Sequence, residues 1–76
     1  MNLSRVLWKC RKGIREVDIL LTSYTKKNYL SLSESEKLNY IEFLDQDTYE
    51  IFDMLVNNRI IQKKYINIVK ALKSFN

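Results

Sequence analysis

The 76-residue sequence contains no histidine, no proline, one glycine and one cysteine. Without histidine, neither a Ser–His nor a Cys–His nucleophile pair can form, and one thiol is too few for a structural zinc site. A single cysteine also excludes the small secreted domains that intrachain disulfides hold together. A chain of this length has little room for a deep catalytic cavity, because ordering it offsets nearly all the free energy gained by burial. We therefore expect a protein that is not an enzyme.

Long apolar runs are also missing. The longest aliphatic run covers residues 19–21, whereas a membrane-spanning helix needs about 20 apolar residues and a signal-peptide core about 7–15. The composition, 46% hydrophobic and 29% charged, is typical of globular rather than disordered chains. These features predict a soluble protein of the cytoplasm, with one domain over residues 1–76.

The scarcity of proline and glycine favours helices joined by short polar turns over β-hairpins. Apolar residues recur at helical spacing over about 3–12, 14–28 and 61–74, and two further helices are expected to begin after Ser33 and Asp47. Ser4 is the expected cap of the first helix, and Gly13 its expected stop. Ser33 with Glu36, and Asp47 with Glu50, have the spacing of capping boxes. The sequence thus predicts an all-α fold, a compact five-helix bundle.

Periodicity also predicts which side chains face the core. In the third helix the expected apolar face is Leu38, Ile41 and Leu44, flanked by Tyr40 and Phe43. In the fourth helix it is Thr48, Phe52 and Leu55, with Ile51 beside them, and in the fifth it is Ile61, Tyr65, Ile68, Val69 and Leu72. Residues 60–69 are rich in β-branched side chains and are the place where a strand would most easily intrude.

The remaining aromatic residues and the cysteine have simpler expected roles. The five tyrosines are expected at the rim of the core with solvated hydroxyls: Tyr24, Tyr29, Tyr40, Tyr49 and Tyr65. Cys10 is expected to be a small buried apolar residue. Trp8 lies on the opposite side of the first helix from Val6 and Cys10, so it either fills a space between helices or, if exposed, anchors an interface.

The net charge of +4 suggests an acidic partner or nucleic acid. The charge is unevenly distributed: +5 over residues 1–27, −6 over 28–57 and +5 over 58–76. The basic last segment has no adjacent aromatic platform for bases, and the turn between the third and fourth helices is acidic, which repels DNA. Nucleic acid is therefore not the expected partner.

Five acidic residues fall in the middle segment: Glu42, Asp45, Asp47, Glu50 and Asp53. Grouped carboxylates can hold a metal ion, but a calcium loop also needs a glycine at its turn, and this segment has none. Their positions at helix caps and on an outer face predict a solvated surface and no metal site.

Charged residues crowd around the single glycine. We call these six residues the Gly13 cluster: Arg11, Lys12, Gly13, Arg15, Glu16 and Asp18. One interpretation is an ordinary helix boundary, with basic residues at the end of one helix and acidic residues in the first turn of the next. The other is a protruding corner, where Gly13 lets a partner's backbone approach and Lys12 and Glu16 supply flanking hydrogen bonds.

Three blocks of the sequence, residues 11–21, 29–37 and 44–55, resemble the FAD assembly factors of succinate dehydrogenase, the bacterial SdhE family with its mitochondrial relatives. The resemblance runs without gaps from about residue 8 to residue 56, and more loosely to residue 72. Three blocks in the same order and spacing make it specific, whereas the Arg-Gly-x-x-Glu element alone is a weak signal.

The resemblance implies a five-helix bundle that acts as an assembly chaperone. Such a factor binds the flavoprotein subunit of succinate dehydrogenase or fumarate reductase and promotes covalent attachment of FAD to a histidine of that subunit. It supplies no catalytic group, binds no cofactor stably, and is expected to be a monomer when free. The family's motif falls on Lys12, Gly13 and Glu16, with the rest of the Gly13 cluster beside it as the partner-binding surface.

The sequence departs from the family at three positions. The motif's arginine is Lys12, which keeps the charge but lacks the planar fork of a guanidinium, and Arg11 is the candidate to replace it. A proline and a tryptophan of the family's fourth helix are Tyr49 and Met54 here, and Met54 is expected to have a packing role. Two other functions stay open at this point: a different protein-interaction module, such as an antitoxin-like protein, and a basic nucleic-acid-binding domain.

Overall fold

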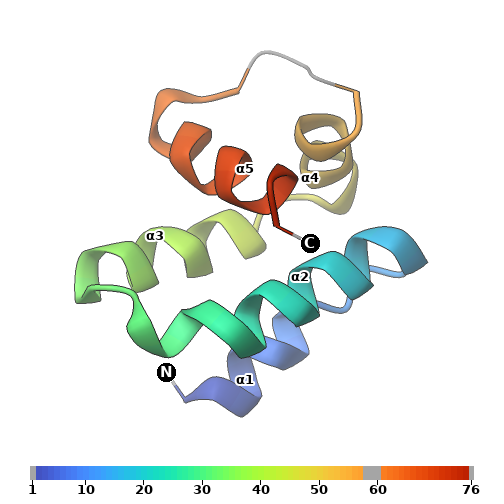
Figure 1. Cartoon of the computed structure of the whole chain (residues 1–76). Coiled ribbons are helices and arrows are strands. Elements are labelled where there is room, and N and C mark those ends of the chain that lie inside the picture. Colours follow the sequence, from blue (N-terminus) through green and yellow to red (C-terminus); the bar gives the residue numbers. More distant parts are fainter. Residues whose placement is uncertain (1, 58–60, 76) are drawn as a thin grey trace.

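The structure, a computed structural model, describes residues 2–57 and 61–75, which form five α-helices and two short 3₁₀ helices (Figure 1). The elements are α1 (Leu3–Lys9), α2 (Arg15–Asn28), η1 (Tyr29–Ser31), α3 (Glu34–Leu44), α4 (Thr48–Leu55), η2 (Lys63–Tyr65) and α5 (Ile66–Lys73). The described residues contain no strand, so the predicted all-α five-helix fold is confirmed. The strand considered for residues 60–69 is absent from residues 61–69, and residue 60 lies outside the described residues.

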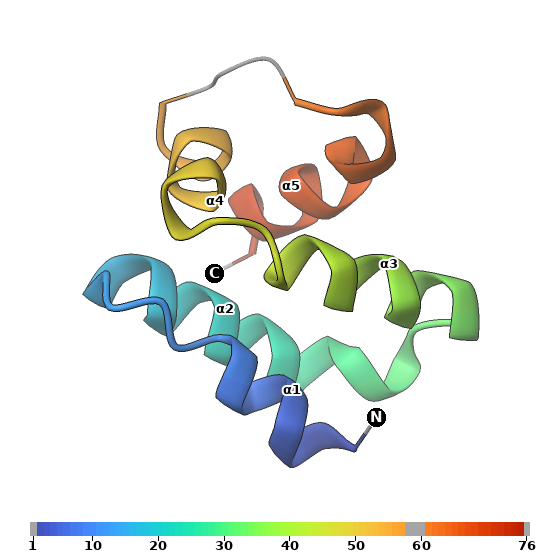
Figure 2. The ribbon, with the colours of Figure 1, turned by 180° about the vertical axis from the view of Figure 1, so that it is seen from behind.

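The helices are arranged in tiers. Figures 1 and 2 show α4 and α5 on one side of the molecule, α1 on the opposite side, and α2 and α3 between them. Helix α1 packs along α2, α4 along α5, and α2 also contacts α5. None of the helices formed by residues 2–57 and 61–75 is long and apolar enough to cross a bilayer.

One core is shared by all five helices, because none is long enough to be stable alone. Its fully buried side chains are Val6, Cys10, Leu21, Thr25, Tyr40, Phe43, Leu44, Ile51, Tyr65, Val69 and Leu72. The expectation that Cys10 is buried is therefore confirmed.

Helix α1 differs from its prediction at both ends. Asn2, not Ser4, caps its start, since the Asn2 side chain accepts a hydrogen bond of 3.0 Å from the Arg5 N–H. The helix ends at Lys9 with Cys10 as its C-cap, so the predicted extent of 3–12 and the stop at Gly13 were wrong. The N–H groups of Lys12 and Gly13 bond to a side chain of α2 instead of to carbonyls of α1, which is why the helix stops early.

Helix α3 begins as predicted but faces the core differently. The Ser33–Glu36 capping box is present, with reciprocal hydrogen bonds of 2.8 and 3.2 Å. The buried residues are Leu44, as predicted, and Tyr40 and Phe43, which were predicted to flank the apolar face, whereas Leu38, predicted to face inward, is 68% exposed. Aromatic contacts fix the rotation of α3 about its axis. The ring centres of Tyr40 and Tyr24 are 5.5 Å apart, and those of Phe43 and Tyr65 are 5.4 Å apart.

Four of the five tyrosines lie in the core, so their predicted rim position was wrong; only Tyr49 is exposed. A buried hydroxyl needs a hydrogen-bond partner, and Tyr40 and Tyr65 have one in the structure. The Tyr40 hydroxyl shares a hydrogen bond of 2.7 Å with Thr25, which also lies 3.3 Å from the Cys10 sulfur. Burial raises the pKa of Tyr40, which keeps this buried chain of three polar groups neutral.

Helix α4 is capped differently from its prediction, and α5 is shorter than predicted. Asp47 caps α4 through the Tyr49 N–H at 3.1 Å, but the capping box with Glu50 does not form. The buried residues of α4 are Ile51 and Met54, so its core face is rotated from the predicted one, and the packing role of Met54 is confirmed. Residues 63–65 form a 3₁₀ turn, and α5 itself begins only at residue 66. As predicted, its lysines and those of η2 are exposed.

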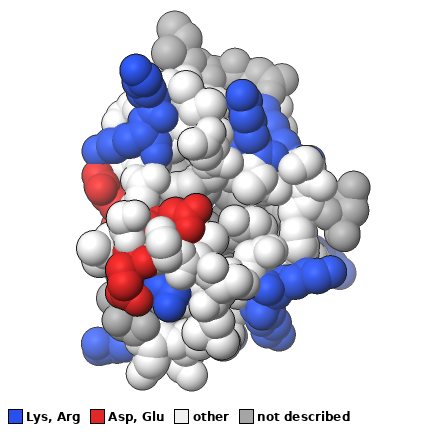
Figure 3. Space-filling model, turned by 60° about the vertical axis from the view of Figure 1, so that its left-hand side comes forward, with Lys and Arg blue, Asp and Glu red and all other residues white. Residues whose placement is uncertain are grey.

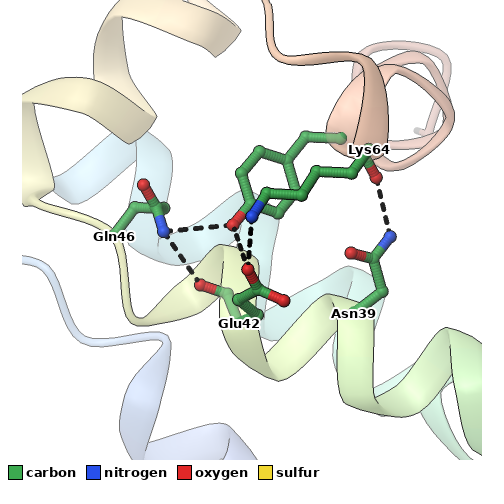
Figure 4. A network of polar contacts seen from close by, with 5 residues as sticks. Asn39, Glu42, Gln46 and Lys64 are labelled. Atoms are coloured by element: carbon green, nitrogen blue, oxygen red, sulfur yellow. Dashed lines mark hydrogen bonds and ion pairs between the residues drawn. The ribbon is translucent and has the colours of Figure 1, made fainter.

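A polar network joins α3 to η2 at the edge of the core (Figure 4). The Glu42 carboxylate accepts hydrogen bonds from the Lys64 ammonium and the Tyr65 hydroxyl. Gln46 donates to the Tyr65 hydroxyl at 3.1 Å, and the Asn39 amide donates to the Lys64 carbonyl at 2.7 Å. These contacts hold the start of the last helical segment against α3.

The Glu42–Lys64 pair is expected to make part of the stability dependent on acid pH. The hydrogen bond and charge of Lys64 hold the pKa of Glu42 below its ordinary value of 4.5. Because the folded state favours the ionised carboxylate, the contribution is present above about pH 4.5 and is lost as the pH falls below it. We expect Glu42→Gln to show a smaller loss of stability between about pH 5 and 3 than the parent chain. Urea midpoints followed by circular dichroism across that range, with the exposed Glu34→Gln as control, measure this; equal slopes for parent and Glu42→Gln contradict it.

Candidate functional site

The connection between α1 and α2, residues 10–14, forms a turn that we call the Gly13 turn (Figure 2). Gly13 has a φ of +86°, in the left-handed region that glycine enters at no steric cost. A Cβ atom added at Gly13 would meet no atom within 4 Å. The backbone conformation therefore favours glycine here, and the space above its Cα is open to another molecule.

Asp18 braces this turn from the first turn of α2. One carboxylate oxygen accepts the Lys12 N–H at 2.8 Å, and the other accepts the Gly13 N–H at 3.1 Å. A carboxylate in the first turn of a helix also interacts favourably with the helix dipole. Asp18 is thus engaged within the chain, and its part in the partner-binding surface stays a prediction.

Lys12 fastens the same turn to α3. Its ammonium donates a hydrogen bond to the carbonyl of Leu44, the last residue of α3, where a positive charge complements the helix dipole. Burial lowers the pKa of Lys12. Beside it, Lys9 forms an ion pair of 2.7 Å with Asp45. The Lys12 side chain therefore points into the molecule, toward the end of α3.

The rest of the Gly13 cluster faces outward. Arg15 and Glu16 are exposed in the first turn of α2, and neither forms an ion pair within the described residues. Arg11 is exposed too, with its guanidinium carbon 5.1 Å from the centre of the Trp8 ring. The structure thus brings all six predicted residues to the Gly13 turn and the first turn of α2, where four face outward and two, Lys12 and Asp18, have side chains bonded within the chain.

The sequence left two alternatives open for Trp8, and the structure decides between them. Of the two alternatives, filling a space between helices is wrong, because the side chain is 68% exposed. Its position opposite the buried Val6 and Cys10 on α1 was the signal for exposure.

We expect Asp18→Asn to lower the free energy of unfolding by about 1–2 kcal/mol. The amide has one acceptor oxygen, so its NH₂ group would face an N–H that the carboxylate now accepts, and a charge-assisted hydrogen bond is lost. Urea unfolding measures the change. Glu50→Gln is the matched control, because it makes the same acid-to-amide change at an exposed side chain and should stay within about 0.5 kcal/mol of the parent. Equal stability of both variants would show that the two hydrogen bonds of Asp18 do not stabilise the fold.

Of the acidic residues of the middle segment, Asp47 caps a helix as predicted, whereas the ion pairs of Glu42 and Asp45 were not predicted. Glu42 and Asp45 pair with lysines, Asp47 caps α4, and Asp53 accepts a hydrogen bond of 2.7 Å from Asn57. Over residues 2–57 and 61–75, no three His, Cys, Asp or Glu side chains come together as a metal-binding group.

The charges are mixed over at least one side of the molecule. Figure 3 shows the side that lies to the left in Figure 1, where acidic side chains lie among lysines and arginines. The net charge of +4 therefore does not produce a uniformly basic surface on this side.

Comparisons with known proteins confirm the resemblance seen in the sequence. A family model described as "Flavinator of succinate dehydrogenase" matches residues 4–76. The FAD assembly factor SdhE of Yersinia pseudotuberculosis is 36% identical over 76 residues, covering 99% of this chain and 86% of the relative. That of Wigglesworthia glossinidia brevipalpis is 34% identical over 73 residues, covering 95% and 87%. No solved structure matches the chain. With a family model that covers nearly its whole length, the chain belongs to the family of succinate dehydrogenase flavinators.

Proposed function

We propose that this chain is an assembly factor that binds the flavoprotein subunit of succinate dehydrogenase or fumarate reductase and promotes covalent attachment of FAD to it. The observation that carries the proposal is the Gly13 turn, which presents an open glycine in a left-handed conformation. The family and the names of the relatives support the same function. Both proteins are proposed to meet in the cytoplasm, with the free factor a monomer.

In this proposal the factor acts by positioning and not by chemistry. The new bond joins the FAD to a histidine of the partner, so this chain contributes no reacting group and keeps no cofactor. Gly13 allows the partner's backbone to approach closely, and the exposed Arg15 and Glu16 provide flanking charges for hydrogen bonds. Holding reactants in a productive geometry can by itself accelerate a reaction by many orders of magnitude.

Lys12 and Asp18 give this surface its rigidity. Asp18 fixes both N–H groups of the turn, and Lys12 ties the turn to α3. A preformed surface loses less conformational entropy on binding than a mobile loop, so more of the interaction energy appears as affinity. Lys12 therefore serves the proposed function from inside the molecule, and Arg11 and Arg15, each two residues from Gly13, are the exposed cations beside it.

Co-expression with each candidate subunit tests the proposal. The flavoprotein of succinate dehydrogenase and that of fumarate reductase are produced separately, with and without this chain, and covalent FAD is read by in-gel flavin fluorescence. We expect more covalent FAD on at least one of them when the chain is present. Equal fluorescence with and without the chain, for both subunits and where attachment is otherwise slow, would reject it.

A further inference from the structure

The outer face of α1 carries a large apolar side chain that the proposed docking at Gly13 does not use. Trp8 is the only tryptophan of the chain and is 68% exposed, while Val6 and Cys10 on the same helix are fully buried. Exposed tryptophans next to arginine are typical of the few residues that contribute most to protein–protein binding.

Trp8 lines two shallow hollows, one along α1 and its N-cap and one between α1 and α2, and they open into a groove. Three adjoining hollows form this groove: the first two share Ser4 and Trp8, and the second and third share Arg11 and Thr22. The groove runs from Arg5 to the exposed Ile19. We call it the α1–α2 groove and define it by Arg5, Trp8, Arg11, Ile19 and Lys26.

Most charges that line this groove are positive, and of its cations only Lys9 forms an ion pair, with Asp45. Within the part of the chain that the structure describes, no carboxylate pairs with Arg5, Arg11 or Lys26. Asp18 also lines the groove, but both of its oxygens accept backbone N–H groups of the Gly13 turn. The groove therefore combines two exposed apolar side chains with three cations that no carboxylate pairs, of which Arg11 lies over the Trp8 ring.

We propose that the α1–α2 groove docks an acidic segment of the partner flavoprotein, and this inference rests on the function proposed above. An apolar side chain of the segment packs on Trp8 and Ile19, and its carboxylates pair with the surrounding cations. Since the groove reaches Asp18, which holds Gly13, the segment forms a second contact region continuous with the Gly13 turn. Such a charge arrangement mainly speeds association and selects the partner.

A protein segment fits this groove better than nucleic acid does. Bases stack on open aromatic faces, and the Arg11 guanidinium already lies over the Trp8 ring at 5.1 Å. Ile19, the other exposed apolar residue, offers aliphatic surface and no stacking platform. An acidic peptide with an apolar side chain uses both features.

Fluorine NMR tests the docking without any substitution. Labelling the chain with 5-fluorotryptophan gives a single resonance, because Trp8 is the only tryptophan. On adding the unlabelled flavoprotein subunit, we expect this resonance to shift and to lose its sensitivity to a soluble paramagnetic agent. A complex seen by size-exclusion chromatography whose resonance is unchanged overturns the groove and leaves the proposed function standing. Absence of any complex overturns the proposed function as well.

Two sets of variants test how the groove contributes to the affinity for the subunit and to the rate of association. Trp8→Ala is expected to weaken binding of the subunit about 10- to 100-fold, whereas Leu38→Ala, with the same exposed fraction, should not. Arg5→Glu with Lys26→Glu is expected to slow association about tenfold at low salt, and less at high salt. Lys63→Glu with Lys70→Glu changes the net charge equally, far from the groove in the sequence, and is the control.

Three outcomes overturn the inference: equal effects of each variant and its control; a shift of the fluorine resonance on adding single-stranded DNA and not the subunit; or the same shift on raising the concentration of the chain alone. The last would identify a second copy of the chain as the occupant. Far-UV circular dichroism of every variant confirms that its helices are formed.

Discussion

Replacing Gly13 with arginine is expected to lower covalent FAD on the flavoprotein about tenfold or more, while the helices stay formed. The large side chain would occupy the open space above the turn, where the partner is proposed to approach. The cost to folding is smaller, because an added Cβ meets no atom and only the left-handed backbone is strained, by about 1–2 kcal/mol. A domain of this length has roughly 4–11 kcal/mol of stability, so the variant should still fold.

A second substitution separates strain from contact. Asparagine tolerates the left-handed conformation better than other non-glycine residues, so Gly13→Asn should be nearly as stable as the parent. If the partner needs the open space, Gly13→Asn still lowers flavin attachment, although less than Gly13→Arg. In-gel flavin fluorescence and urea unfolding are measured on the same preparations. Full attachment with Gly13→Arg would show that the Gly13 turn is not the contact surface.

Phe43→Ala is expected to cost about 3–5 kcal/mol, the largest stability effect among the changes considered. Phe43 is fully buried in α3, and its ring meets that of Tyr65 edge-on at 5.4 Å. Removing it leaves a cavity between α3 and the last helical segment, and the loss is a large part of the total stability. The thermal midpoint should fall by about 15 °C or more. Thermal unfolding followed by circular dichroism at 222 nm gives the answer.

Leu38→Ala is the control for that experiment, since Leu38 lies on the same helix but is exposed. It should change the free energy of unfolding by no more than about 0.5 kcal/mol. The pair of variants decides between the face of α3 that periodicity predicts and the face that the structure shows. A large cost for Leu38→Ala would favour the predicted face, in which Leu38 points inward and Phe43 only flanks it.

The fold features that the sequence predicted correctly are local ones. The capping box of Ser33 and Glu36 joins residues three apart, and the number of helices follows from short-range spacing and the lack of proline. The rotation of α3 was missed because it depends on rings distant in the chain, such as that of Tyr24 against Tyr40. Likewise, a buried tyrosine needs a partner for its hydroxyl, and Thr25 is 15 residues away from Tyr40.

In the candidate site, too, the sequence predicted local features and missed contacts between residues distant in the chain. The only glycine could be located by inspection, and its backbone is left-handed, although it does not end α1 as predicted. That Lys12 points inward follows from the position of the Leu44 carbonyl, 32 residues away, which spacing alone does not give. The two hydrogen bonds that Asp18 accepts depend on the angle between α1 and α2. Helix-dipole arguments therefore predicted an acidic residue in the first turn of α2, but not these hydrogen bonds.

The burial of Cys10 has a consequence for handling and for oxidative stress. Burial raises the pKa of its thiol, so little thiolate is present near neutral pH, and the fully buried sulfur is out of reach of a second molecule. Peroxide and disulfides react with accessible thiolates. A protein proposed to work beside a flavin, a cofactor of oxygen chemistry, thus carries its only thiol where oxidants reach it slowly. The purified chain should remain free of intermolecular disulfides without added reductant.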